Sequence, residues 1–214
     1  MQSIRMDYSQ KVKWLIGLSI IVKLALSFLL ELGNDEVYYY TYAVQPDWNH
    51  FDHPPVVGWM IQLSTLNLNW VSTLSMRLGS IVAAATATWF IFRTGSLIKS
   101  ERAGWIAALL YTFSIYTSII AGLFIMPDSP QVLFITLSIY MMTKWVIQPQ
   151  SFSVFNWLGL GCLIGLATLS KVHGLYLWAG FGGFILFHQV KTLKQSYLYL
   201  SALITICMIF PIVY

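Results

Sequence analysis

Residues 14–30 read WLIGLSIIVKLALSFLL, an apolar stretch with a single charged residue, Lys23. A helix needs ~20 mainly apolar residues to cross the hydrocarbon core of a bilayer. The residues before this stretch are basic, as in a secretory signal, but no small-x-small cleavage pattern follows it. We therefore interpret residues 14–32 as an uncleaved first transmembrane helix.

The composition of the whole chain also indicates a membrane protein. Of the 214 residues, 57% are hydrophobic and 9% are charged, and the mean hydropathy is +0.69. A soluble domain usually carries about 25% charged residues, so this chain has too few charges to cover a surface that faces water. Cys162 and Cys207 lie in apolar segments without metal-type spacing, which gives no support to a redox or zinc role.

Apolar stretches recur along the chain and predict an all-α polytopic membrane bundle of about seven helices. The predicted segments are 14–32, 74–92, 103–126, 131–147, 157–169, 175–187 and 197–214. The stretch VVGWMIQLSTL at 56–66 is apolar but short, which is typical of an interfacial or re-entrant helix. We treat residues 1–214 as a single transmembrane domain.

The charged residues predict how the bundle is oriented, because cytoplasmic loops are enriched in Lys and Arg. If the N-terminus is cytoplasmic, nine of the twelve basic residues fall on the inner side: Arg5, Lys11, Lys13, Arg93, Lys99, Arg102, Lys144, Lys191 and Lys194. The acidic residues that fall on the outer side are Glu31, Asp35, Glu36, Asp47, Asp52 and Asp128. The basic exceptions are Lys23, Arg77 and Lys171, and for Lys23 we expect pairing within the bundle.

The predicted first outer loop carries two groups of ionisable residues. Asp35 and Glu36 follow the first helix, where they are either a solvated helix end or part of a site. The nearby aromatic residues fit an interfacial belt or a wall that binds sugar or lipid, and they are Tyr38, Tyr39, Tyr40, Tyr42 and Trp48. Asp52 and His53 fit an acid/base pair, a metal site or a polar loop, and the two prolines after them fix the backbone.

Further ionisable residues fall at the same predicted depth. Asp128 in MPDSP fits a tight turn, or a functional carboxylate, since an ionised Asp near hydrocarbon is costly unless it is paired. Lys171, close to His173, either extends to the headgroups or binds an anion such as a lipid phosphate, and Arg77 presents the same choice. A carboxylate can take a proton from an attacking hydroxyl, and cations or a metal can stabilise a phosphate leaving group. A polyprenyl-phosphate sugar contains both the phosphate and the lipid.

Four motifs in order resemble one family of membrane enzymes. They are NDEVYYYTYAVQPDWNHFDHPPVVGWMIQL at 34–63, SMRLGSIVAAATATWFIF at 75–92, MPDSPQVLF at 126–134 and GLATLSKVHGLYL at 165–177. Together they resemble the N-terminal membrane region of polyprenyl-phosphate-sugar glycosyltransferases of the GT-C fold. The most similar in appearance are the dolichyl-phosphate-mannose protein mannosyltransferases and the aminoarabinose transferases that modify lipid A.

The resemblance implies an inverting transfer, in which an acceptor hydroxyl attacks C1 of the sugar and the polyprenyl phosphate leaves. It implies that Asp35 is the general base and that Glu36 accompanies it. Asp52 and Asp128 would be cavity carboxylates and candidate ligands of a divalent metal ion. The remaining implied substrate-binding residues are Lys171 at the lipid phosphate, with His53, Arg77 and His173. His53 stands where the aminoarabinose transferases have Lys, which removes a fixed positive charge.

The resemblance also implies partners and a location. The partners would be a polyprenyl-phosphate sugar, a lipid, glycan or protein acceptor and membrane lipid, without nucleic acid. The site would face the outside of a bacterial-type cytoplasmic membrane. Family members continue with further helices and usually an outer soluble domain. We therefore expect this chain to be a fragment, a truncated gene product or one half of a split enzyme.

Two other functions remain open at this point. A transporter or lipid flippase would need ionisable groups at mid-membrane or on both faces, whereas here they gather on one face. A non-catalytic scaffold would tolerate replacement of the acidic residues. The glycosyltransferase hypothesis instead predicts that Asp35, Asp52, Asp128 and Lys171 line one outward cavity.

Overall fold

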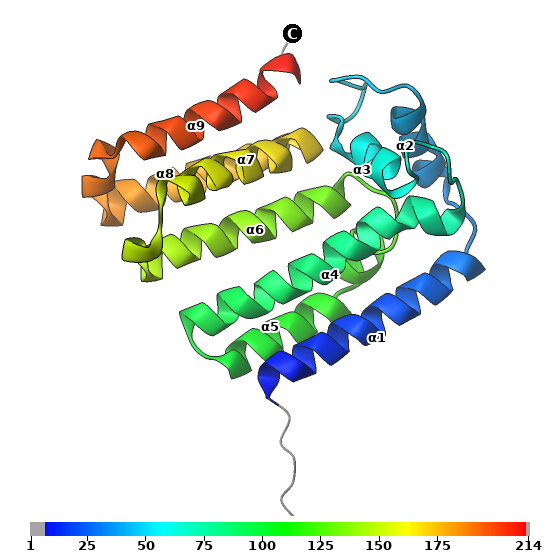
Figure 1. Ribbon diagram of the computed structural model, residues 1–214, viewed down its shortest axis with the longest axis horizontal. Coiled ribbons are helices and arrows are strands. Elements are labelled where there is room, and N and C mark those ends of the chain that lie inside the picture. The colour runs from blue at the N-terminus through cyan, green and yellow to red at the C-terminus, as the bar shows by residue number, and fades with distance from the viewer. Residues whose placement is uncertain (1–6, 213–214) are drawn as a thin grey trace, which may run out of the picture.

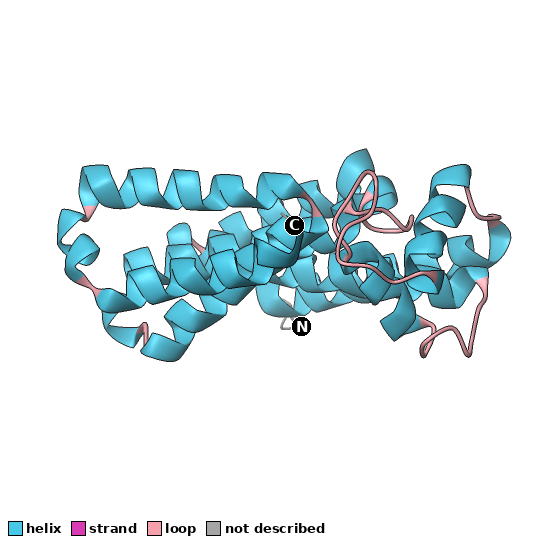
Figure 2. Ribbon diagram, turned by 90° about the horizontal axis from the view of Figure 1, so that it is seen from above, coloured by secondary structure: helices cyan, strands magenta, loops and turns pink. Residues whose placement is uncertain are grey.

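The computed structural model describes residues 7–212, which form a bundle of helices that includes no β-strand (Figure 1). Its α-helices are α1 (Tyr8–Leu29), α2 (Asn34–Val44), α3 (Val56–Ser64), α4 (Thr73–Ile98), α5 (Glu101–Phe113), α6 (Asp128–Ile147), α7 (Val154–Ser170), α8 (Tyr176–His188) and α9 (Ser196–Ile209). Helices α1, α4, α6, α7 and α9 lie side by side in that order, and α5 packs against α1 and α4. The short helices α2 and α3 pack together at one end of the bundle, where the longer irregular connections also gather (Figure 2).

The architecture confirms the predicted all-α membrane bundle, although its helices differ in length. Within residues 7–212, α1, α4 and α6 are long and apolar enough to cross a membrane. Helix α7 and the segment Ser196–Ile212 are apolar but shorter, and α5 and α8 have 13 residues each. Fewer helices than the expected seven therefore reach full spanning length.

Helix α2 occupies a stretch that the sequence analysis treats as loop. The Glu36 side chain accepts a hydrogen bond from the Gly33 N–H, which satisfies a donor at the start of the helix. One face of α2, which includes Tyr39 and Tyr42, is buried in an apolar cluster with Val57 of α3. The helix is stabilised by this packing rather than by an apolar sequence of its own.

The predicted segment 103–126 is not one continuous helix. Helix α5 ends at Phe113, and a π-helical turn spans Tyr116–Ile120 before an irregular stretch leads to α6. The Thr117 hydroxyl donates a hydrogen bond to the Tyr111 carbonyl. Hydroxyl side chains compete with the helical ladder in this way, and π-helical turns occur frequently at functional sites. The interruption therefore has a local chemical cause in the sequence FSIYTSII.

The contact between α7 and α9 depends on a glycine. A Cβ on Gly161 would collide with the backbone carbonyl of Ser201, whereas a Cβ on Gly159 would meet nothing within 4 Å. The Thr205 hydroxyl donates to the Gly161 carbonyl at 2.8 Å. Small residues allow such close backbone approach between membrane helices, so Gly161 sets the spacing of the two helices.

We expect Gly161→Ala to lower the free energy of unfolding by about 1–3 kcal/mol, because the added methyl group has to push α9 away. Gly159→Ala is the matched control on the same helix and should be neutral or stabilising by up to about 1 kcal/mol. Unfolding of both variants in mixed micelles would check this. Equal stability of the two variants would contradict the close contact.

Candidate active site

A buried ion pair joins Glu36 of α2 to Arg77 of α4. The Arg77 Nε and Nη2 donate to the two Glu36 carboxylate oxygens at 2.8 and 2.6 Å, and the two side chains are 0% and 3% exposed. Arg77 also donates to the backbone carbonyls of Leu30 and Glu31. The Glu36 carboxylate accepts from the Ile125 N–H at 3.1 Å.

This network ties the end of α1, helix α2, helix α4 and the segment before α6 together. Arg77 and Glu36 direct their hydrogen bonds to each other and to the backbone, and neither has an appreciable exposed surface. Such an arrangement supports a structural role. Arg77 is fully buried, whereas Glu36 also lines the cavity that Asp35 lines, so catalysis by Glu36 and phosphate binding by Arg77 stay predictions.

A second, more accessible polar network surrounds Asp128. The Lys171 Nζ lies 3.2 and 3.3 Å from the two Asp128 carboxylate oxygens, and the Tyr116 hydroxyl donates to one of them. The Lys171 and Asp128 side chains are 26% and 12% exposed, so this pair, unlike the first, reaches the surface. Burial, and then the hydrogen bond to Asp128, raises the pKa of Tyr116.

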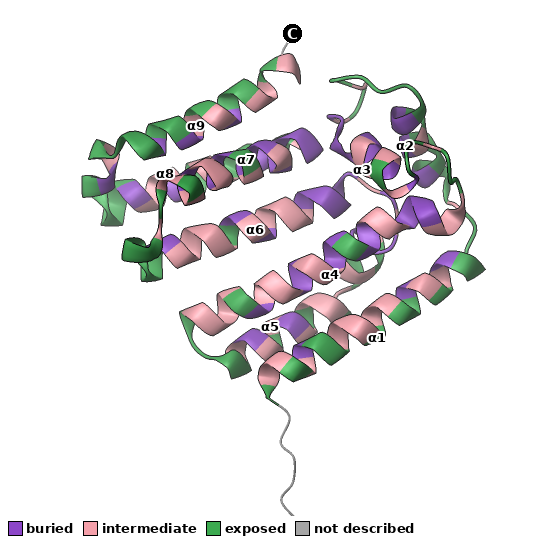
Figure 3. Ribbon diagram, in the orientation of Figure 1, coloured by how far each residue is buried: buried purple, intermediate pink, exposed green. Residues whose placement is uncertain are grey.

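The fold positions this network by ending two neighbouring helices at the same place. Asp128 is the first residue of α6, and Lys171 follows the last residue of α7. The backbone after Lys171 folds back tightly, because a Cβ on Gly174 would collide with the backbone of Thr168. The Gln131 side chain reaches the Lys171 carbonyl at 3.4 Å. Figure 3 shows that buried residues gather where these two helix ends approach α3.

Asp52 and His53 belong to the same electrostatic environment. The pKa of His53 is lowered, first by burial and then by the Lys171 cation, while Asp52 and Asp128 act in the opposite direction and His173 adds to the lowering. The pKa of His53 thus responds both to the Lys171 cation and to the Asp52 and Asp128 carboxylates. Pro54 and Pro55 are buried and α3 begins directly after them, so the loop is anchored close to these side chains.

Tyr39 lies next to His53, and the Asp35 charge also acts on it. Its ring centroid lies 5.9 Å from that of His53. Its pKa is raised to about 12, first by burial and then by nearby groups that include Asp35, Asp52 and Asp128. Tyr39 thus shares the electrostatic environment of these three predicted carboxylates.

Asp35 is exposed and lines a cavity of about 610 Å³ between the α1–α2 connection and the segment before α6. Its other lining residues include Glu31, Ile120 and Met126. The lining does not include Lys171 or Asp128. The prediction that all four residues line one cavity therefore remains a prediction.

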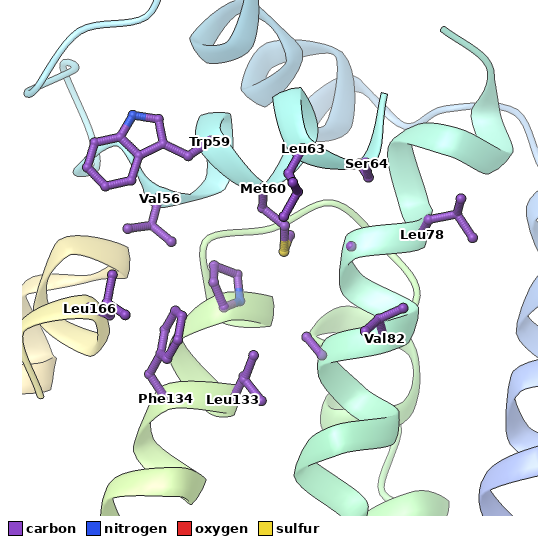
Figure 4. A pocket seen from close by; sticks show the side chains of 13 residues that line it. Val56, Trp59, Met60, Leu63, Ser64, Leu78, Val82, Leu133, Phe134 and Leu166 are labelled. Carbon is purple, nitrogen blue, oxygen red and sulfur yellow. The ribbon is translucent and has the colours of Figure 1, made fainter. Parts of the chain in front are cut away.

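An apolar groove of about 470 Å³ lies in the same part of the bundle as α3 and the start of α6 (Figure 4). It lies between α3, α4, α6 and α7, and its walls include Trp59, Val82 and Phe134. Val56 and Pro130 also line it, and they follow His53 and Asp128 closely in the sequence.

The donor set for a metal is limited in the described part of the chain. No three His, Cys, Asp or Glu side chains of residues 7–212 gather in a way that could hold a metal ion. Within residues 7–212, Asp52 and Asp128 thus do not form a three-ligand site with another such side chain.

Three tyrosines of this region are absent from the predicted site. The Tyr116 hydroxyl donates to Asp128, the Tyr38 hydroxyl accepts a hydrogen bond from the Tyr42 hydroxyl, and the Tyr39 ring lies next to His53. The polar residues that interrupt the apolar stretch FSIYTSII are the sequence feature that could identify Tyr116 as a site residue. Tyr38 and Tyr39 were recognised only as members of an aromatic run.

The charged residues separate to the two ends of the bundle as the sequence predicts. Asp35 and Asp128 lie in the first turns of α2 and α6 and Asp52 lies just before α3, whereas Lys99 follows α4, Arg102 lies in the first turn of α5 and Lys144 is in the last turn of α6, at the opposite end of the bundle. Arg5 lies outside the described residues.

Comparison with known proteins identifies the family. The sequence model of the dolichyl-phosphate-mannose-protein mannosyltransferases matches residues 52–214, which include Asp52, His53, Asp128 and Lys171 but not Asp35 or Glu36. A search of curated proteins and a search of solved structures each returned no significant match. Because the match covers most of the chain, and because the described part is an all-α bundle with membrane-spanning helices, this chain belongs to the dolichyl-phosphate-mannose-protein mannosyltransferase family of membrane glycosyltransferases.

Proposed function

We propose that the protein transfers a sugar from a polyprenyl-phosphate-linked donor to a hydroxyl group of a lipid, glycan or protein acceptor. The reaction would occur at the end of the bundle that holds Asp128 and Lys171, facing the outside of a bacterial-type cytoplasmic membrane. The proposal is supported by the accessible Asp128–Lys171 pair and by the apolar groove, whose lining residue Pro130 follows Asp128 by two positions. A lipid phosphate needs a cation for its head and an apolar surface for its chain.

Lys171 would stabilise the leaving phosphate. Its ammonium group is oriented by Asp128, which is itself fixed by the Tyr116 hydroxyl. As the bond between C1 and the phosphate oxygen breaks, negative charge develops on the phosphate. A cation that is already oriented stabilises this charge more in the transition state than in the ground state.

Asp35 would take the proton of the attacking hydroxyl. It is exposed and lines a cavity of about 610 Å³ at this end of the bundle, so an acceptor can approach it. The acceptor oxygen forms the new bond to C1, its proton passes to the Asp35 carboxylate, and the phosphate leaves from the opposite side. His53, whose pKa is lowered, is neutral at neutral pH and can exchange hydrogen bonds with the sugar.

We expect Asp35→Asn to lower sugar transfer by about 10²–10⁴-fold, because the amide cannot accept the proton. Transfer from a polyprenyl-phosphate sugar would be measured in membranes that contain the full gene product. Asp47→Asn is the matched control, since Asp47 is also exposed and its carboxylate accepts a hydrogen bond from the adjacent Trp48 N–H. Equal transfer by wild type and Asp35→Asn would remove Asp35 from the mechanism. Lipid flux without transfer would instead favour a flippase.

A further inference from the structure

Lys23 lies within the membrane-spanning helix α1, yet its side chain is buried, with 7% exposed. Its Nζ lies close to Gly122 in the α5–α6 connection. A Cβ added to Gly122 would lie 2.8 Å from this nitrogen. The ion pairs among residues 7–212 are Glu36–Arg77 and Asp128–Lys171. The expected pairing of Lys23 within the bundle is therefore not found in the described part of the chain.

The Lys23 side chain lines a cavity of about 180 Å³ between α1 and the α5–α6 connection. Thr112 and Ser118 contribute to the lining, and the Thr112 hydroxyl oxygen is buried without a hydrogen-bond partner within residues 7–212. Among residues 7–212, the Thr112 hydroxyl in this cavity thus has no hydrogen-bond partner, and Lys23 has no ion-pair partner. Buried polar groups are normally paired, so this arrangement indicates a missing ligand.

The charge of the missing ligand follows from Lys23. An ammonium group at this depth is costly unless a negative group compensates it. The carbonyls of Thr117 and Ser118 lie next to Gly122 and provide only partial negative charge. An oxyanion would supply the full charge, and it could also accept a hydrogen bond from the Thr112 hydroxyl.

The mouth of the cavity indicates where the rest of the ligand lies. Leu18, Val22 and Phe113 line the cavity and are 63%, 49% and 76% exposed, on surfaces that face lipid in a membrane. The volume is smaller than the roughly 300–1,000 Å³ of pockets for drug-sized ligands. It fits one charged group and the start of a chain.

We propose that this cavity binds the oxyanion of a membrane lipid, a phosphate or a carboxylate, with Lys23 as its cation and the hydrocarbon chain lying along α1. The site is separate from the Asp128–Lys171 pair, which lies between α6 and α7. The two are connected by the π-helical turn Tyr116–Ile120, since Ser118 lines the cavity and Tyr116 binds Asp128. A bound lipid would thereby stabilise the turn that holds Tyr116.

The test uses photoactivatable lipids in nanodiscs of phosphatidylcholine that contain the full gene product. Diazirine analogues of oleate, of phosphatidylglycerol and of phosphatidylcholine would be crosslinked separately, and the labelled peptides mapped by mass spectrometry. We expect an anionic analogue to label residues 15–26 and 112–123, and Lys23→Met to reduce this labelling by about tenfold or more, because a charge-assisted hydrogen bond is lost. Lys13→Met, an exposed lysine on the same helix, should leave it unchanged.

Two further arms make the outcome decisive. Lys23→Arg keeps the positive charge and should retain the labelling, which separates loss of the site from loss of the fold. Labelling by oleate alone would identify a carboxylate ligand, and labelling by phosphatidylglycerol a phosphate ligand. Undiminished labelling in Lys23→Met, or equal labelling by the neutral phosphatidylcholine analogue, would overturn the proposal.

Discussion

Replacing Arg77 with methionine is expected to lower the free energy of unfolding by about 3–5 kcal/mol, which is the usual effect of removing one partner of a buried ion pair. The variant leaves the Glu36 carboxylate buried without its cation, and it also leaves the carbonyls of Leu30 and Glu31 without their donors. Reversible unfolding in mixed micelles of dodecyl maltoside and dodecyl sulfate would measure the change.

Two comparisons separate this effect from a general loss of packing. The double variant Glu36→Leu/Arg77→Met removes both charges and should recover part of the lost stability, because no unpaired ion remains. Asp47→Asn changes an exposed carboxylate in the same region and should stay within about 0.5 kcal/mol of wild type. An Arg77→Met variant as stable as wild type would show that the ion pair does not stabilise the bundle.

Replacing Lys171 with methionine is expected to reduce sugar transfer by about 10²–10³-fold, the typical effect of losing one group that stabilises transition-state charge. The fold should be affected little, since the Lys171–Asp128 pair is partly exposed and such pairs stabilise proteins by at most about 1 kcal/mol. The measurements are kcat and KM for the polyprenyl-phosphate donor, together with the unfolding transition.

The controls for this prediction follow from the same contacts. Lys171→Arg keeps the charge and should retain part of the activity, whereas Lys99→Met changes an exposed lysine at the opposite end of the bundle and should have no effect. Asp128→Asn leaves the lysine charged but weakens its orientation, so we expect a smaller loss than in Lys171→Met. If Lys171→Met lost stability and activity to the same degree, the lysine would be structural.

The membrane class of this protein could be predicted from the sequence because long apolar helices need no partner to be recognised. Helix α2 could not, because NDEVYYYTYAV is polar and aromatic, and its stability comes from Gly33, from α3 and from Arg77, which is 41 residues away. The end of α5 at Phe113 could not be predicted either, because the stretch around it is apolar rather than polar. Its polar residues are few, and the hydropathy of the stretch stays high across them.

The site could be predicted in its residue types but not in its pairing. Asp128 and Lys171 are unusual as charges beside apolar sequence, and the structure brings them together. Arg77 has the same unusual setting, yet the local sequence contains no sign that its partner is Glu36. Distant pairs of this kind are decided by which helices pack against each other, and hydropathy alone does not contain that information.

The Glu36–Arg77 network also bears on how the chain is made. Glu36 leaves the ribosome 41 residues before Arg77 and 89 residues before Ile125, whose N–H completes the carboxylate's hydrogen bonds. At a synthesis rate of ~5–20 residues per second, Arg77 is made roughly 2–8 seconds after Glu36. During that interval the carboxylate has to stay in water or at the headgroups, so α2 cannot settle against the bundle until α4 has been inserted. The end of the bundle that carries α2 therefore cannot be completed before α4 is in place.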